Sequence, residues 1–211
     1  MLKICANKSR PCAHSSVGQS TWLRTKGSGV RIPLGAPEKN KMQDSRFKSR
    51  LAARNLQLET FFMQEALKEA EKAYKKKEVP IGAVIVSDNK IIARGHNLKE
   101  TSADPTAHAE IIAIKKAAKK LERWRLSNST IYVTLEPCTM CMGALIQARV
   151  ERLVFGCFDP KAGAAGSLYD ISNDKRLNHR IKLSTDVMAE ECGKILKDFF
   201  KGLRKRNSRR R

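Results

Sequence analysis

The sequence predicts an α/β domain in which helices pack in layers against a sheet. Segments of strand-like composition alternate along the chain with segments of helical apolar spacing, which is the order that α/β folds produce. The longest apolar runs, such as IGAVIV at 81–86, have strand length and fall far short of the ~20 residues of a membrane helix. With 41% hydrophobic and 30% charged residues, the 211-residue chain has the composition of a soluble globular protein.

The first predicted elements are a helix and a β-hairpin. The helix begins at about Glu59, where the pattern of the sequence changes, and ends near Lys77. Its apolar positions follow helical spacing, with Glu and Lys on the other face: Phe62, Ala66, Leu67, Ala70, Ala73 and Tyr74. GAVIVSDNKIIARGHN at 82–97 then predicts two strands joined by the turn SDNK.

The rest of the chain continues the alternation of helices and strands. The predicted elements are a helix at 106–121 opened by Pro105, a strand at 129–137, a helix at 138–149, a strand at 152–158, a loop at 163–167, a strand or edge segment at 181–187 and a helix at 189–206. We therefore predict one globular domain at 46–204, followed by a basic tail at 205–211.

Residues 1–45 differ in composition from the rest of the chain. Ser, Gly, Pro and basic residues dominate and no apolar periodicity is present, so we predict a disordered basic extension. Two interpretations stay open. The segment is a transit or binding tail, or it is a tRNA gene read as protein from an upstream start. GVRIP within 15–37 back-translates to a sequence that resembles a tRNA T-arm, which would place the true start near Met42 or Met63.

Positive charge is concentrated at the two ends of the chain. The net charge is +21, and residues 1–41 and 201–211 each contribute +7 of it. Basic ends on a moderately basic core favour a polyanionic partner, and nucleic acid fits best. The alternative is that the charge only serves solubility in a host whose proteins are generally basic.

The cysteines favour metal or redox chemistry over disulfide bonds. Residues 1–20 contain no apolar core of a secretory signal, so we expect an intracellular protein. In that setting a Cys-x-x-Cys pair is typical of a metal site or a redox dithiol. Two of the six cysteines are spaced in this way: Cys5, Cys12, Cys138, Cys141, Cys157 and Cys192.

A histidine and two cysteines are candidates for one metal site. Cys138 and Cys141 would share a face of the helix at 138–149, and Pro137 suits its first turn. The positive end of the helix dipole would favour thiolates, the form that binds metal. His108 falls in the first turn of another helix that begins at a sheet edge. Three such ligands would leave a fourth tetrahedral position open, which is typical of a catalytic zinc. The alternatives are a buried or redox-active cysteine pair and a structural histidine.

Glu110 is a candidate proton carrier and a poor candidate for a fourth ligand. It lies two residues from His108, and helix positions i and i+2 do not share a face. Its position between Ala109 and Ile111 argues against a solvated surface residue. A carboxylate next to a metal-bound water can take the proton of that water and pass it on.

The motifs H-x-E and P-C-x-x-C together are the signature of zinc deaminases that act on cytosine or adenine. DPTAHAEIIA at 104–113 and YVTLEPCTMCMGALIQARV at 132–150 resemble the bacterial tRNA-specific adenosine deaminase family. The resemblance runs from about Phe62 to Arg206 and includes KEVPIGAVIV, FGCFDPKAGAAGSLYD and LNHR.

The resemblance implies a fold, a chemistry and a set of residues. The fold is a cytidine deaminase-like three-layer α/β/α sandwich around a mixed five-stranded sheet, in a cytoplasmic homodimer. One Zn²⁺ per subunit is held by His108, Cys138 and Cys141. Zinc-bound hydroxide attacks C6 of the wobble adenosine in the tRNA anticodon stem-loop, Glu110 shuttles protons, and inosine results. Further positions match residues that contact the RNA: Asn97, Asp159, Lys161, Asn178, His179, Phe200 and Arg204.

Two rival functions remain at this stage. A deaminase of free cytosine, cytidine or guanine would share the zinc centre, although its small neutral substrate would need no basic C-terminal helix. A non-catalytic zinc-stabilised RNA-binding module would need a fourth protein ligand and would leave Glu110 without a role. Among the RNA contacts, Asn97 has the alternative of a hairpin-end turn residue. Phe199 or Phe200 has the alternative of a core anchor for the last helix.

Overall fold

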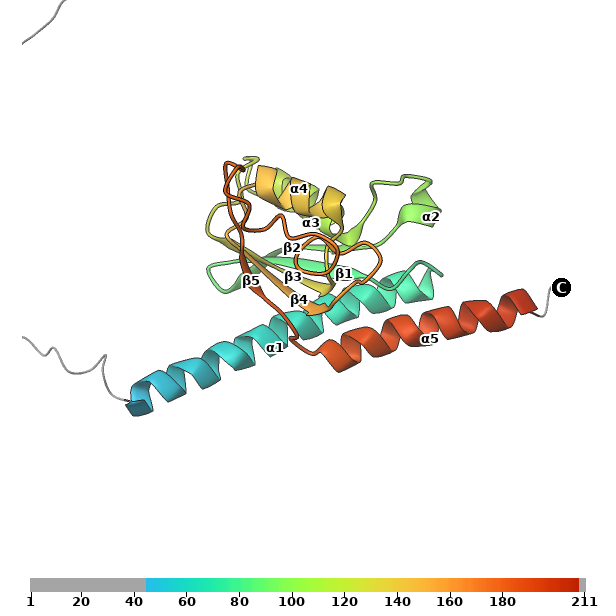
Figure 1. The fold of residues 1–211 in the computed structure, drawn as a ribbon, viewed down its shortest axis with the longest axis horizontal. Helices are drawn as coiled ribbons and strands as arrows, with labels where there is room; N and C mark the ends of the chain where they lie inside the picture. The colour runs from blue at the N-terminus through green and yellow to red at the C-terminus, as the bar shows by residue number, and fades with distance from the viewer. Residues whose placement is uncertain (1–44, 209–211) are drawn as a thin grey trace, which may run out of the picture. The chain divides into compact units, whose positions relative to one another are not determined.

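The computed structural model describes residues 45–208, which form a five-stranded sheet between two layers of helices (Figure 1). The elements in chain order are α1 Ser45–Lys75, β1 Gly82–Ser87, β2 Lys90–His96, α2 Lys99–Ser102, α3 Ala109–Lys120, β3 Ser129–Leu135, α4 Thr139–Gln147, β4 Arg152–Cys157, β5 Lys182–Ser184 and α5 Ala189–Ser208. Among these helices, none is long and apolar enough to cross a membrane.

The sheet is mixed, as expected. Its strand order is β2-β1-β3-β4-β5. β1 runs antiparallel to both β2 and β3, while β3, β4 and β5 are parallel to one another. Because Leu135 pairs with Cys157, the segments that follow β3 and β4 leave the sheet side by side. That edge of the sheet, where parallel strands end, is where α/β proteins commonly bind ligands.

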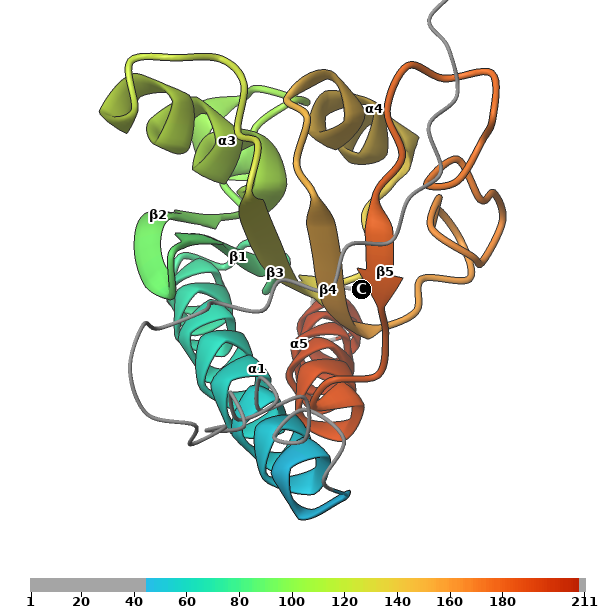
Figure 2. The ribbon, with the colours of Figure 1, turned by 90° about the vertical axis from the view of Figure 1, so that its left-hand side faces the viewer.

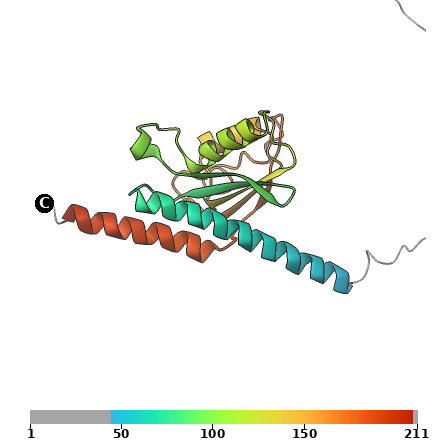
Figure 3. The same ribbon diagram turned by 180° about the vertical axis from the view of Figure 1, so that it is seen from behind.

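Helices cover both faces of the sheet, which confirms the three-layer α/β/α sandwich. α1 and α5 lie against one face, and α3 and α4 lie against the other (Figures 1, 2 and 3). The side chains of the central strands alternate between the two interfaces. Ile131, Val133 and Phe155 belong to the apolar cluster under α3 and α4, whereas Tyr132 and Val154 belong to the cluster under α1 and α5. This alternation is the period of two expected for strands that are buried on both sides.

The predicted hairpin turn is present. Asp88 and Asn89 connect β1 to β2 with φ of 49° and 57°. Positive φ at both central residues is the requirement of a two-residue type I′ turn, and Asp and Asn tolerate it better than most residues.

Two glycines allow close contact between the sheet and its helices. A Cβ on Gly82 would run into the carbonyl oxygen of Ala66 in α1, and a Cβ on Gly95 would run into that of Ala109 in α3. A side chain at either position would therefore push a helix off the sheet. Gly95 matters most for the site, because Ala109 is the first residue of α3.

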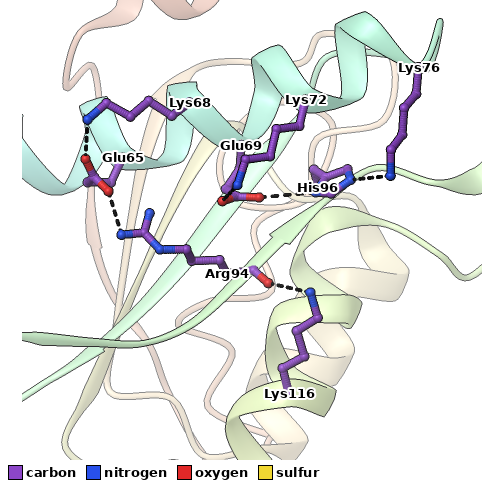
Figure 4. A network of polar contacts seen from close by, with 8 residues as sticks. All are labelled: Glu65, Lys68, Glu69, Lys72, Lys76, Arg94, His96 and Lys116. Carbon is purple, nitrogen blue, oxygen red and sulfur yellow. Dashed lines mark hydrogen bonds and ion pairs between the residues drawn. The ribbon is translucent and has the colours of Figure 1, made fainter.

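A polar network ties α1 to β2 and β2 to α3 (Figure 4). Glu69 is buried and contacts Lys72 Nζ at 2.6 Å and His96 Nδ1 at 3.1 Å. Burial lowers the pKa of His96 below its ordinary value, although the contact with Glu69 opposes the shift. Glu65 pairs with Arg94 at 2.5 Å. These contacts fix the end of β2, one residue before Asn97.

The first two helices differ from the predictions. α1 begins at Ser45, fourteen residues before the predicted start at Glu59. Its first twelve residues after Ser45 have exposed side chains, so good helix formers there continue the helix without the apolar spacing that marks a buried face. The short helix α2 was not predicted at all.

The helices that carry the candidate ligands begin later than expected. α3 begins at Ala109 instead of Thr106, because Asp104 Oδ1 accepts hydrogen bonds from the backbone and hydroxyl of Thr106, both at 2.7 Å, and closes a turn. α4 begins at Thr139, so Pro137 precedes the helix and does not occupy its first turn. His108 and Cys138 are consequently N-cap residues and not helical ones.

The ends of the chain lie outside the described residues. The prediction of a disordered basic extension concerns residues 1–44 and Ser45, of which only Ser45 is described, at the start of α1. At the other end, α5 continues through Ser208, so the described part of the basic tail prolongs the last helix.

Candidate metal centre and active site

His108, Cys138 and Cys141 meet at the starts of α3 and α4. β3 ends at Leu135 and delivers Cys138 to the N-cap of α4, where its backbone is extended at φ −73° and ψ 173°. His108 caps α3 in a similar conformation, at φ −75° and ψ 155°. Cys141 follows in the first turn of α4. Two extended N-cap residues at adjacent helix starts thus direct their side chains into one space.

The distances within this group fit a tetrahedral zinc ion. His108 Nδ1 lies 3.5 Å from Cys141 Sγ and 3.8 Å from Cys138 Sγ, and the three ligand atoms all lie within 4.8 Å of one another. Tetrahedral zinc with ordinary bond lengths separates a histidine nitrogen from a cysteine sulfur by about 3.6 Å. Cys141 is buried, whereas His108 and Cys138 are half-buried, so the group is partly accessible to solvent.

The protonation of the group favours one thiolate even without metal. The hydrogen bond from Cys141 lowers the pKa of Cys138 to about 4, and the same bond raises the pKa of Cys141. Contact with the Cys138 sulfur raises the pKa of His108. Cys138 is therefore held as a thiolate, the form of cysteine that binds metal.

Glu110 lies beside the group as the second residue of α3. It is 3% exposed, and burial raises its pKa above the ordinary value. Among the described residues, its Oε2 is the one buried side-chain oxygen or nitrogen without a hydrogen-bond partner. A buried carboxylate oxygen without a donor is costly, and it is common at catalytic sites. A water held between His108, Cys138 and Cys141 by a metal would supply the missing donor.

Asn97 directly follows β2 and is buried. Leu98 N donates to Ala107 O at 3.0 Å, so the segment of Asn97 runs directly beside the segment of His108. The Asn97 side chain donates from Nδ2 to Glu78 Oε2 at 3.3 Å. This bond leaves its carbonyl oxygen available as an acceptor.

Glu78 is a structural residue that the sequence analysis missed. It is 1% exposed, and besides Asn97 it accepts hydrogen bonds from the backbone of Glu100 at 3.2 Å and of Thr101 at 2.5 Å. It therefore joins the segment after α1 to the first turn of α2. It follows three lysines directly, and no local signal in the sequence indicates its burial.

Glutamine in place of Glu78 should lower the free energy of unfolding at pH 7 by about 1.5–3 kcal/mol, because charge-assisted hydrogen bonds are lost. Burial alone would raise the pKa of Glu78, but the hydrogen bonds from Thr101 and Glu100 lower it below its unfolded value. A lowered pKa contributes stability above the unfolded pKa of about 4.3, and this stability disappears as the pH falls through the folded pKa. Urea titrations at pH 7 and pH 3.5 should therefore show a smaller deficit in acid. An equal deficit at both values would contradict the charge argument.

Asp159 and Lys161 lie in the segment that follows β4, a few residues before Gly163, which pairs with Cys138. Gly163 forms a bridge with Cys138, and Ala164 N donates to Pro137 O at 2.9 Å. Asp159 is half-buried, and its Oδ1 accepts from Lys161 N at 2.9 Å. The structure therefore places both predicted RNA contacts in a segment that is bonded to the backbone beside Cys138, a candidate metal ligand.

Asn178 and His179 lie elsewhere in the same chain. The Asn178 carbonyl accepts from Arg149 at 2.7 Å, and His179 Nε2 contacts Val150 O at 2.6 Å. Arg149 and Val150 follow the C-terminal end of α4, a helix of nine residues, whereas Cys138 lies at its start. A helix of that length spans ~13 Å. Within one chain, the structure does not bring these residues to the metal centre.

Phe200 and Arg204 are exposed on the C-terminal half of α5. Phe199 is the buried neighbour, and its ring packs on Tyr74 of α1 at 5.8 Å and on Phe200 at 5.5 Å. Phe199 is thus the core anchor, and Phe200 is available for contact. In Figure 1, this half of α5 lies on the same side as α2 and the C-terminal end of α1.

Comparison with known proteins agrees with this geometry. Residues 59–204 match the family model of MafB19-like deaminases. The chain is 52% identical over 145 residues to the tRNA-specific adenosine deaminase of Bacillus subtilis, covering 69% of this chain and 90% of that protein. It is 50% identical over 139 residues to the enzyme of the same name from Haemophilus influenzae, covering 65% and 80% of the two chains.

A solved structure gives the same result. It comes from a study of A-to-I editing by tRNA:A34 deaminases, is 43% identical, and aligns with a TM-score of 0.63 over 65% of this chain and 99% of its own. The fold and the site together define a deaminase. Within that class, the chain belongs to the family of tRNA-specific adenosine deaminases.

Proposed function

We propose that this enzyme converts adenosine to inosine at the wobble position of a tRNA anticodon by zinc-dependent hydrolytic deamination. The observation that carries the proposal is the group of His108, Cys138 and Cys141 at zinc-ligand spacing, with the partnerless oxygen of Glu110 beside it. The names of the relatives support a tRNA adenosine as substrate. When bound, zinc supplies an acidified water as the nucleophile.

The protein residues supply ligands, proton transfer and orientation. His108, Cys138 and Cys141 are the protein ligands, and one Zn²⁺ is expected per subunit. Glu110 would take one proton from the attacking water and deliver it to N1 of the adenine. It would then take the second proton from the new hydroxyl on C6 and pass it to the departing amine, which leaves as ammonia. Its raised pKa suits this role, because a proton carrier must give up the proton as readily as it takes it. Asn97 orients the nucleotide through its carbonyl oxygen.

The RNA substrate is supported by charge and by exposed side chains around the site. Asp159 and Lys161 belong to the segment whose Gly163 pairs with Cys138, and Phe200 and Arg204 are exposed on α5. Stacking of a splayed base on Phe200 and phosphate contacts from Lys161 and Arg204 suit a single-stranded anticodon loop. Asn178 and His179 remain proposed RNA contacts, and their distance from the metal centre requires RNA bound across α4 or held by a second subunit.

We further propose that the enzyme is a cytoplasmic homodimer. Leu168, Tyr169 and Leu177 expose 53%, 58% and 39% of their surfaces in the long segment between β4 and β5. Exposed apolar side chains gathered in one segment are typical of a protein interface. Sedimentation equilibrium of the purified protein should give twice the chain mass, and a monomer at micromolar concentration would contradict the proposal.

The substrate is tested directly with synthetic RNA. An anticodon stem-loop with adenosine at the wobble position should gain inosine, whereas a matched RNA with adenosine only at other loop positions should not. Free cytosine, cytidine and guanine are the competing substrates. If the enzyme deaminated one of these small substrates and did not deaminate the RNA, the proposal would be replaced by the rival activity on free bases or nucleosides.

Removing residues 205–211 should weaken RNA binding without slowing the reaction on saturating RNA. The deleted segment contains five basic residues and no acidic one, so it can add only phosphate contacts. Each lost contact should make the slope of log K against log salt concentration shallower by about 0.7 for single-stranded RNA. Binding titrations at several salt concentrations measure this slope. An unchanged slope would show that the tail lies outside the interface.

A further inference from the structure

Glu136 is a buried carboxylate that the proposed chemistry does not use. It lies between the end of β3 and Cys138, and it is 3% exposed. Its Oε1 accepts from the backbone of Ala165 at 2.8 Å and of Ser167 at 3.0 Å. Its Oε2 accepts from the backbone of Asp159 at 3.0 Å and from the Ser167 hydroxyl. All four donors come from one segment, residues 159–167.

The same segment has a shape that fits the carboxylate. A Cβ on Gly163 would run into the Glu136 carboxylate, so the chain passes over it at a distance that only glycine allows. The segment is also joined to the backbone beside Glu136, through the bridge of Gly163 with Cys138 and the bond of Ala164 with Pro137. Residues 159–167 therefore surround the side chain of Glu136 and are bonded to the backbone of Pro137 and Cys138, the second of which is a candidate metal ligand.

We propose that Glu136 is a positioning residue that holds the substrate-facing segment 159–167 in register with the metal centre. It fixes the backbone of Asp159, and Asp159 Oδ1 in turn fixes the backbone of Lys161, so both predicted RNA contacts are positioned through one chain of hydrogen bonds. The inference rests on the proposed function for its effect on catalysis, but the anchoring itself does not depend on which substrate is bound.

A glutamine at this position cannot reproduce the contacts. Glu136 faces N–H donors with both oxygens, three of them from the backbone. The amide nitrogen of glutamine would be forced to face either Asp159 N–H or the pair from Ala165 and Ser167. Because two donors repel each other and a buried donor would be left unpaired, one end of the segment should detach while the side-chain volume stays the same.

The test compares Glu136→Gln with Glu59→Gln in the full-length enzyme. Glu59 pairs with Arg152 between α1 and β4, and this partner lies outside residues 159–167. Glu59→Gln thus removes a partly buried acid without touching the segment. For both variants, the measurements are zinc content, kcat and KM on the anticodon stem-loop, and amide hydrogen exchange of residues 158–168.

Glu136→Gln should keep its zinc and raise KM about tenfold, with kcat changed less than threefold, and its segment should exchange faster. Glu59→Gln should leave KM and exchange of the segment unchanged. Ser167→Ala, which removes one bond, should change KM in the same direction by a smaller factor. Unchanged exchange in Glu136→Gln, or a KM no higher than that of Glu59→Gln, would overturn the proposal. Loss of zinc in Glu136→Gln would also overturn it, because Glu136 would then support the ligand turn instead.

If the proposed function were wrong, the experiments would give a different result from the one that overturns the anchoring role of Glu136. In that case the wild-type enzyme would not deaminate the stem-loop, and the kinetic comparison would not be made. The exchange measurement still decides the anchoring role, because faster exchange confined to residues 158–168 supports it and unchanged exchange overturns it.

Discussion

Replacing Glu110 with glutamine should lower kcat on the RNA by a factor of about 10²–10⁴, while zinc and RNA remain bound. The side chain keeps its size, so the buried site beside α3 should not collapse. Glutamine cannot accept and return a proton, and proton transfer to N1 and to the leaving amine depends on that exchange. Single-turnover kinetics on the anticodon stem-loop, together with zinc content by mass spectrometry, measure both parts of the expectation.

Glu122→Gln is the matched control, because Glu122 is exposed just beyond the other end of α3. It should behave as the wild-type enzyme in every assay. Turnover at the wild-type rate by a zinc-replete Glu110→Gln enzyme would refute the proton-transfer role. Loss of zinc in that variant would instead place Glu110 among the ligands, against the geometry of the three-residue group.

Alanine at Cys138 or at Cys141 should remove zinc and activity together. Each substitution leaves two protein ligands, and a site with two ligands cannot hold zinc against ordinary chelators. Thermal stability should fall as well, because metal binding to the folded state contributes to its stability. Zinc content, melting temperature and turnover of the purified variants check the three effects.

Cys157→Ala provides the control for these variants. Cys157 is half-buried at the end of β4 and its thiol donates to Thr134 O at 3.4 Å, apart from the metal-binding group. The variant should keep its zinc and most of its activity. One zinc per chain in both Cys138→Ala and Cys141→Ala would show that the ligand set is wrong.

Most of the fold follows from local patterns in the sequence. Short runs of strand-like composition predict the strands, and the turn SDNK predicts the hairpin because Asp88 and Asn89 accept positive φ. Helix starts were predicted less well. Pro105 and Pro137 suggested first-turn positions, but the turn closed by Asp104 and the extended backbone of Cys138 delay both helices. These features depend on side-chain hydrogen bonds that apolar spacing does not report.

The sequence likewise predicts some residues of the candidate site and gives no indication of others. The H-x-E and P-C-x-x-C motifs predict the grouping of His108, Cys138 and Cys141, which the structure confirms as a group that can hold a metal. Glu78 and Glu136 were missed because the partners that bury them lie more than twenty residues away in the sequence, in α2 and in the segment after β4. A single sequence without its contacts gives no signal for such residues.

The hydrogen bonds between Glu136 and residues 159–167 have a practical consequence for redesign of the enzyme. Pro160 and Ala162 are exposed, and the backbone on both sides of them is held by hydrogen bonds to the Glu136 side chain, which lies just after β3. Libraries that vary these two positions can therefore alter the surface offered to a nucleic acid at little thermodynamic cost. Gly163 and Ser167 should be held constant in the same libraries, since the mutational tolerance of their neighbours depends on them.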